Sequence, residues 1–288
     1  MGHGNHWECL GGTAEERVAQ FMPLVLAKGK VGESIKRTAQ WPGRTKAAAE
    51  AVIQLSYKAK PLGCMVVSVT DTPHKTINVF TAFPYAGSGG KRRLRILEIR
   101  DWGNQIEGEL LCEAADGNGI VGFFDTHFLL NCEKYEVGKE YVFELAGLIY
   151  EARCTNEEKI EVTDQAVLAE RYAAYGETPE RLPDGNLPPQ SVHLAGMTGL
   201  CPADKYPDDA EFYCVIGEVS EFELEGIRIF KIIPQFADED CKKIPLPGVI
   251  FGAATLFKNG YVPKIGDSIG GSLWVQGFLT GHPRKKAK

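Results

Sequence analysis

The chain has 288 residues, of which 44% are hydrophobic and 24% charged, and its formal net charge is −6. These values indicate an ordinary soluble globular protein, long enough for two compact units. No apolar run approaches the roughly 18 residues that a membrane span requires. The polar start from Met1 to Glu8 lacks the basic and apolar regions of a secretory signal. We therefore expect a cytoplasmic protein without a membrane partner.

The cysteines also favour a reducing compartment. Eight of them are scattered singly along the chain, and no CxxC pair occurs. His3, His6 and Cys9 recur at every third residue, as metal ligands can do. Three ligands at a chain terminus with no fourth in reach make a poor zinc site, so we expect no metal and no cofactor.

Two helices are expected near the N-terminus. Thr13 and Glu16 have the spacing of a capping box, and apolar residues follow at helical intervals from Val18 to Val25. Pro23 lies inside this run, where it is expected to kink or split the helix. A second helix is expected after Gly43, where an apolar stripe is formed by Ala48, Ala51, Val52 and Leu55. The sequence thus predicts a helical segment over residues 1–62.

The period of the pattern changes at residue 63. Residues 65–69 and 76–83 are rich in β-branched and aromatic side chains, and the turn residues between them predict a hairpin. Further short strands are expected at 94–100, 106–112 and 120–124. A short helix is expected at 163–175, capped by Thr163 or Asp164, and a Pro-rich segment follows it.

The most informative pattern is a stretch that occurs twice. Residues 135–149 and 261–279 each contain an apolar-Gly-charged turn followed by a long alternating strand. The later copy has two extra residues at Gly270 and Gly271, and an even insertion leaves the buried face unchanged. Residues 106–108 and 224–226 form a second corresponding pair. These repeats predict a duplicated β unit.

We therefore expect a mainly β protein with α-helices, built from two tandem small antiparallel β-barrels. The expected barrels cover residues 63–155 and 211–281, a linker covers 156–210, and a basic tail covers 282–288. In strand number and size the units resemble the OB-fold, and the resemblance is at the level of the fold alone. A pair of immunoglobulin-like sandwiches is the competing architecture.

A Gly-rich loop at residues 86–90 precedes the strongest basic run. The spacing of a Walker A loop is not met, because Tyr85 and Arg92 occupy two of its required positions. Basic groups can neutralise phosphates and aromatic faces can stack on bases. The candidate residues for nucleic-acid binding are Lys91, Arg92, Arg93, Arg95, Tyr85 and Phe83. The alternative is a solvated turn whose arginines pair with the acidic body of the protein.

Asp125 and His127 form a polar pair in an otherwise apolar stretch. On a strand they would share a face, and a histidine held by an aspartate is the arrangement of a general base. The corresponding stretch of the second unit, residues 251–254, keeps neither residue. They are the weak candidates for a catalytic site.

Three classes of function remain open. The first is a non-enzymatic protein that holds single-stranded nucleic acid through the Gly-rich basic loop. The second is an interaction, scaffold or inhibitor protein whose acidic body docks a protein partner. The third is a hydrolase-like enzyme that uses Asp125 and His127. Twin barrels without a recognisable catalytic constellation favour binding over turnover.

Overall fold

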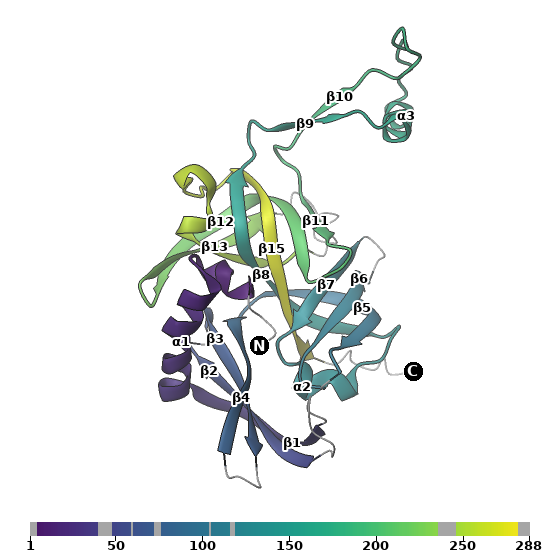
Figure 1. Cartoon of the computed structure of the whole chain (residues 1–288). Helices are drawn as coiled ribbons and strands as arrows, with labels where there is room; N and C mark the ends of the chain where they lie inside the picture. The colour runs from purple at the N-terminus through teal and green to yellow at the C-terminus, as the bar shows by residue number, and fades with distance from the viewer. Residues whose placement is uncertain are drawn as a thin grey trace.

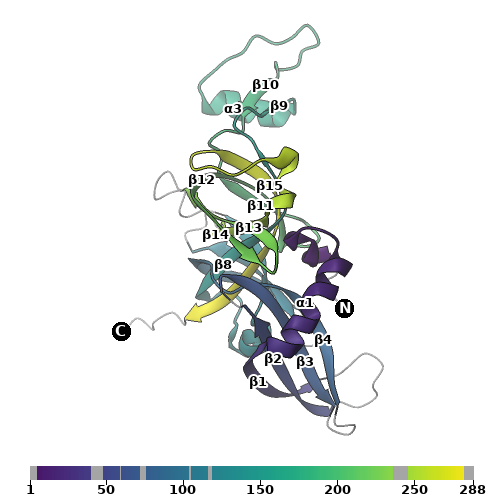
Figure 2. The same cartoon turned by 90° about the vertical axis from the view of Figure 1, so that its left-hand side faces the viewer.

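The computed structural model describes residues 5–39, 48–58, 60–71, 76–103, 105–115, 119–235 and 246–281. In this part of the chain the protein is mainly β with a few helices, as predicted. Figures 1 and 2 show a four-stranded sheet crossed by a helix, a larger curved sheet, and an arm that projects from the far end.

The N-terminal part begins with the 3-10 helix η1 (Asn5–Leu10) and the helix α1 (Ala14–Lys28). The predicted capping box is confirmed. The Glu16 N–H donates to Thr13 Oγ1 over 3.2 Å, and the Thr13 N–H donates to the Glu16 carboxylate over 2.9 Å. α1 runs without interruption across Pro23 and lies against β2 and β3, the central strands of the first sheet (Figure 2).

The second expected helix is wrong, because Ala48–Tyr57 forms strand β2. Val52 and Gln54 are buried, and Ile53 and Leu55 are half-buried, which is the period-two pattern of a strand. β2 pairs with β1 (Lys30–Ala39) on one edge and with β3 (Leu62–Asp71) on the other. Pairing on both edges outweighs the helix propensity of the alanines.

The first sheet is completed by β4 (Thr76–Ala86), and its strand order is β1-β2-β3-β4. β3 and β4 pair antiparallel along their length, which confirms the predicted hairpin. The expected unit boundary at residue 62 falls between β2 and β3, whereas these two strands are hydrogen-bonded neighbours in the structure.

The second sheet has nine strands in the described part of the chain, in the order β11-β12-β13-β14-β8-β15-β7-β6-β5. In chain order its strands are β5 (Gly90–Asp101), β6 (Gly108–Ala114), β7 (Ile120–Asp125), β8 (Glu140–Cys154), β11 (Gly199–Pro202), β12 (Asp209–Leu224), β13 (Ile227–Gln235), β14 (Val249–Ala253) and β15 (Ser268–Gly281). Two further pairings, β8 with β5 and β12 with β15, close this sheet on itself twice.

Each closure gives a ring of five hydrogen-bonded strands. The first ring runs β5-β6-β7-β15-β8 and returns to β5, and the second runs β12-β13-β14-β8-β15 and returns to β12. In each ring the third strand pairs parallel to a long strand of the other unit, β7 to β15 and β14 to β8. β8 and β15 also pair antiparallel with each other, so both rings share them.

The two rings repeat each other in detail. Gly138 and Gly266 have positive φ angles of 82° and 87° in the turns before β8 and β15. The Gly138 N–H donates to Ile96 O over 2.7 Å, and the Gly266 N–H donates to Ile216 O over 2.8 Å. A register irregularity follows each of these isoleucines in β5 and β12. The two stretches that the sequence repeats are therefore equivalent strands in equivalent surroundings.

Short helical turns follow the third strand of each ring. α2 (Phe128–Asn131) and the 3-10 turn η2 (Cys132–Lys134) follow β7. The 3-10 turns η4 (Ala254–Leu256) and η5 (Lys258–Gly260) follow β14. One apolar cluster fills the interior of the two rings. A second cluster packs the first sheet, η1 and α1 against the outside of the rings.

The arm consists of β9 (Lys159–Val162), α3 (Gln165–Ala174) and β10 (Gln190–His193), and it extends away from the rings (Figure 1). Asp164 caps α3 by accepting from the N–H groups of Ala166 and Val167, which confirms the predicted helix. A small apolar cluster of its own holds the arm together.

Candidate functional site

The two aromatic residues predicted to stack on bases are buried. Phe83 and Tyr85 lie on β4 with exposed fractions of 1% and 7%. The Phe83 ring meets Phe124 of β7 edge-on at 5.0 Å between centroids, and Tyr85 meets His127 edge-on at 5.8 Å. These rings hold the first sheet against the first ring, so neither offers a free face to a base.

The basic run starts β5, directly after the Gly-rich loop. Lys91 and Arg93 are exposed, and their side chains lie on one face because they are two residues apart on a strand. Arg92 is half-buried, which lowers the pKa of its guanidinium, and its Nη1 donates to the Lys91 carbonyl. Arg95 lies between Glu113 and Glu140, at 2.9 and 3.2 Å. Its charge is balanced within the protein.

The end of β15 lies close to this run. Arg93 pairs with Val142 of β8, and Val142 pairs in turn with Gly281 of β15. Neighbouring strands are about 4.8 Å apart, so Gly281 and Arg93 are separated by roughly 10 Å. Gly281 is the last described residue. The basic tail of residues 282–288, singled out in the sequence, lies outside the described residues but begins here.

Asp125 and His127 do not form the expected general-base pair. Asp125 Oδ2 accepts from the Tyr135 hydroxyl over 2.5 Å, and Oδ1 accepts from the main-chain N–H of His127 over 2.9 Å. The His127 ring instead packs edge-on against Tyr85 and Phe278. Burial raises the pKa of Asp125 to about 7 and lowers the pKa of His127 to about 4. Both residues therefore hold the end of β7 to its surroundings.

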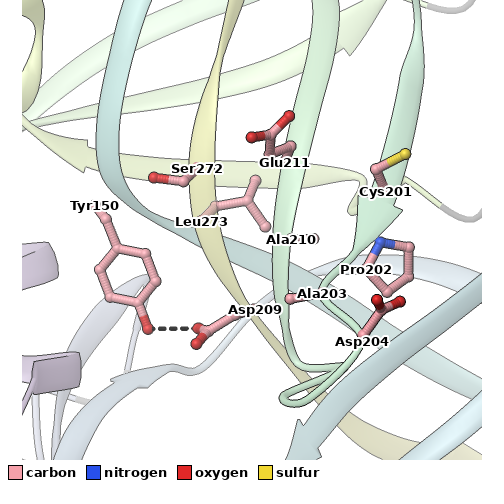
Figure 3. Close-up of a pocket in the computed structure, with 10 residues that line it drawn as sticks. All are labelled: Tyr150, Cys201, Pro202, Ala203, Asp204, Asp209, Ala210, Glu211, Ser272 and Leu273. Atoms are coloured by element: carbon pink, nitrogen blue, oxygen red, sulfur yellow. Dashed lines mark hydrogen bonds between the residues drawn. The ribbon is translucent and has the colours of Figure 1, made fainter.

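A feature that the sequence did not indicate is a pair of adjoining cavities beside the start of β12. Tyr150 of β8 and Asp209 of β12 line both cavities, and the Tyr150 hydroxyl donates to Asp209 Oδ1 over 2.8 Å (Figure 3). The smaller cavity has a volume of about 470 Å³ and carries Asp204 and Glu211 on its walls. We call the two cavities together the acidic trough.

The larger cavity, of about 830 Å³, lies among η1, the turn between β5 and β6, and the start of β12. Its lining is formed by Asn5, His6, Glu8, Trp102, Glu109, Tyr150, Tyr206, Asp208 and Asp209. The Trp102 indole donates to Glu109 Oε1 over 3.0 Å, and the Trp274 indole donates to Asp208 Oδ2 over 2.9 Å.

The trough is strongly acidic, and three of its carboxyl groups, Glu109, Asp208 and Asp209, have raised pKa values. Burial, and after it the nearby Glu109 carboxylate, raise the pKa of Asp208 to about 7. Burial also raises the pKa values of Glu109 and Asp209. The lining residues come from five separate segments of the chain, so no local pattern in the sequence could have indicated the trough.

Comparison of the chain with protein-family models, with curated proteins and with solved structures finds no match. Among the described residues, none of the helices combines the length and the apolar character needed to cross a membrane. Over the same residues, no group of three or more histidine, cysteine or acidic side chains is placed to hold a metal ion. The candidate sites therefore rest on geometry and charge.

Proposed function

We propose that this protein is a non-enzymatic binding protein with two OB-like barrels, and that it holds single-stranded nucleic acid along the start of β5. Its two five-strand rings support the comparison. In each, three consecutive antiparallel strands are followed by a helical turn, and the third strand pairs parallel with a long strand of the other unit. OB-folds are five-stranded barrels that often bind oligonucleotides. The shared β8 and β15 would make the barrels interdependent.

The observation that carries the proposal is that the exposed basic residues of β5 lie two strands from the end of β15, at one end of the first ring. Lys91 and Arg93 are exposed on β5, and the chain leaves β15 at Gly281 two strands away. Four basic and no acidic residues follow in the sequence. A strand of nucleic acid that crosses this edge would meet Lys91 and Arg93 and pass the end of β15, and each phosphate contact releases a counterion.

An aromatic side chain is also present at this edge, in place of the two buried ones. Phe278 of β15 is half-buried and pairs with Glu144 of β8, which pairs in turn with Lys91. The three side chains therefore lie on the same face of adjacent strands. Stacking of a base on Phe278 would complement the phosphate contacts without reading sequence.

The test is the salt dependence of binding to a fluorescently labelled oligothymidylate, followed by anisotropy. The Lys91→Ala/Arg93→Ala variant should bind more weakly. The slope of log K against log salt should fall by about 1.4, since each lost contact with a single strand removes about 0.7. Arg95→Ala is the matched control, because Glu113 and Glu140 already balance that charge. No binding at low salt, or equal losses in both variants, would contradict the proposal.

The hydrolase alternative has no supporting observation, because the Asp125 carboxylate is engaged by Tyr135 and by the main chain. A protein that docks a partner through its acidic body remains a second candidate. The acidic trough favours a positively charged ligand for that role.

A further inference from the structure

Carboxyl groups dominate the lining of the acidic trough. Among the described residues that line the two cavities there is no lysine or arginine, and His6 is the side chain there that can gain a positive charge at low pH. The carboxyl groups belong to Glu8, Glu109, Asp208 and Asp209 in the larger cavity and to Asp204, Asp209 and Glu211 in the smaller one. Such a surface repels phosphate, so it is distinct from the nucleic-acid edge proposed above.

Two of these carboxyl groups are buried and form no ion pair among the described residues. Glu109 and Asp208 are only 6% and 2% exposed. Each has one oxygen bound to a neutral indole N–H, from Trp102 and Trp274. Burial raises the pKa of Glu109 and the charge of Arg100 offsets part of that rise, but the ion pair of Arg100 is made with Glu98. Burial of a carboxylate is costly, and a bound cation would offset part of that cost.

Aromatic rings stand beside these acids. Trp102 is 38% exposed, and its hydrogen bond to Glu109 fixes the indole at the cavity wall. Tyr206 is 51% exposed, and the Lys205 ammonium already stands 5.0 Å from its ring centroid. An organic cation is attracted to the face of an aromatic ring, most strongly to tryptophan. Trp102 and Tyr206 therefore line the same cavity as the buried carboxyl groups.

The size of the trough decides between a metal ion and a larger ligand. The larger cavity alone, at about 830 Å³, lies in the range of about 300–1,000 Å³ that holds small organic ligands. Beyond the Tyr150–Asp209 pair, the smaller cavity continues the acidic lining to Glu211. A ligand with more than one positive group would therefore find carboxylates along its length.

We infer that the trough binds an organic cation, with one ammonium or guanidinium group held between the Trp102 ring and the carboxylates of Glu109 and Asp208. A second positive group of the ligand lies beyond Tyr150, near Glu211. This chemistry has two sources. One is a free polyamine, and the other is the lysine or arginine side chains of an extended peptide.

The experiment is isothermal titration calorimetry on the full chain with two probes, spermidine and a short lysine-glycine peptide of equal charge. Binding of spermidine alone assigns a free polyamine, and tighter binding of the peptide assigns a protein segment. Trp102→Leu and Glu109→Gln should each weaken the bound probe at least tenfold. Lys205→Met should tighten it, because a competing positive charge is removed from the ring of Tyr206.

Two controls separate this site from general attraction to an acidic protein. Glu180→Gln makes the same change of charge as Glu109→Gln, but on the exposed arm, and should leave the affinity unchanged. Lys91→Ala/Arg93→Ala should also leave it unchanged, so failure of the nucleic-acid proposal would be seen separately. Quenching of tryptophan fluorescence by the probe in the unmutated chain gives a readout that needs no variant. Absence of heat and of quenching with both probes, or equal weakening by Glu109→Gln and Glu180→Gln, would overturn the inference.

Discussion

Gln276 of β15 binds Pro84 of β4, and through it joins the two sheets. Its Nε2 donates to the Pro84 carbonyl over 2.7 Å, while its Oε1 accepts from the Ala86 N–H over 2.9 Å. The side chain is 1% exposed, so both main-chain groups are sheltered from water. One amide therefore satisfies a donor and an acceptor of the neighbouring sheet at once.

Gln276→Leu should lower the free energy of unfolding by about 2–4 kcal/mol, because it leaves one buried N–H and one buried carbonyl without partners. Urea unfolding followed by circular dichroism measures the change. Gln235→Leu, at an exposed position at the end of β13, is the matched control and should change stability by less than about 0.5 kcal/mol. A similar small change in both variants would mean that Gln276 does not join the sheets.

The paired turns before β8 and β15 give a test of the duplication. A Cβ added at Gly138 or Gly266 would meet no other atom within 4 Å, and both residues have positive φ. Gly138→Ala and Gly266→Ala therefore isolate the backbone cost, and each should destabilise the chain by about 1–2 kcal/mol. Thermal unfolding of the two variants measures this. Unequal costs, with one near zero, would contradict the equivalence of the turns.

These turns could be predicted because they are determined by residues close together in the sequence. An alternating pattern and a glycine with positive φ are set within a few residues, as in residues 135–149. The sharing of β8 and β15 between two rings depends on pairing between strands more than a hundred residues apart, which no local pattern encodes. β2 was misread for the same reason, since neighbouring strands outweigh its alanines.

The exposure of individual side chains could not be predicted from the sequence either. Phe83 and Tyr85 fit the alternating pattern of a strand, but the pattern does not show that residues of the first ring cover this face of β4 as well. In the sequence Arg95 looks like Lys91 and Arg93. Only the tertiary structure shows that Glu113 and Glu140 balance the charge of Arg95. The acidic trough is assembled from residues between Asn5 and Leu273 and depends wholly on tertiary structure.

The arm should be dispensable for folding of the rings. The Leu194 N–H donates to the Glu158 carbonyl over 2.9 Å, so the two ends of the arm already meet. The apolar cluster of the arm is separate from the ring clusters, and its buried members are Leu168, Tyr172 and Leu187. Deletion of residues 159–193 with a two-glycine join should shift the melting temperature by only a few degrees, because closing a short loop costs little.

Leu168→Ala in the full chain is the complementary variant. It should expose the arm to limited proteolysis, because it removes the centre of a small cluster, while the melting temperature of the rings stays unchanged. A deletion variant that fails to fold, or loss of the main thermal transition in Leu168→Ala, would show that the arm supports the rings.

Stability should fall as the pH rises, in part through Asp125. The carboxyl group has a pKa near 3.9 in an unfolded chain and about 7 in the folded protein, where burial disfavours its charge. Between these values the folded state keeps a proton that the unfolded state has lost, so its stability declines from pH 4 to pH 7. The stability of the unmutated chain relative to Asp125→Asn should therefore decrease by about 1–4 kcal/mol across this window.

Urea unfolding at several values between pH 4 and pH 8 measures that difference. Asp184→Asn is the control, because hydrogen bonds from Asn186 lower the pKa of this exposed carboxyl, so its ionisation is complete in both states above pH 5. A constant difference between the unmutated chain and Asp125→Asn would mean that Asp125 is ionised throughout.

The affinity of the acidic trough for spermidine should rise between pH 6 and pH 8. Burial and the Glu109 charge bring the pKa of Asp208 to about 7, so its negative charge develops in this interval. Glu109 and Asp209 face the same cavity with raised pKa values and act in the same direction, while Arg100 stays positive throughout. Calorimetry in two buffers of different ionisation enthalpy should detect proton release on binding near pH 7.

Asp208→Asn should remove most of this pH dependence and leave weaker binding at pH 8. The His6 ring lies 3.0 Å from the Tyr150 hydroxyl and also faces the cavity, and its protonation at low pH would oppose a cation in the same way. His6→Gln separates the two contributions, because it keeps a polar side chain but cannot titrate. If the pH profile flattens in His6→Gln and persists in Asp208→Asn, the buried carboxyl is not the group whose charge the ligand requires.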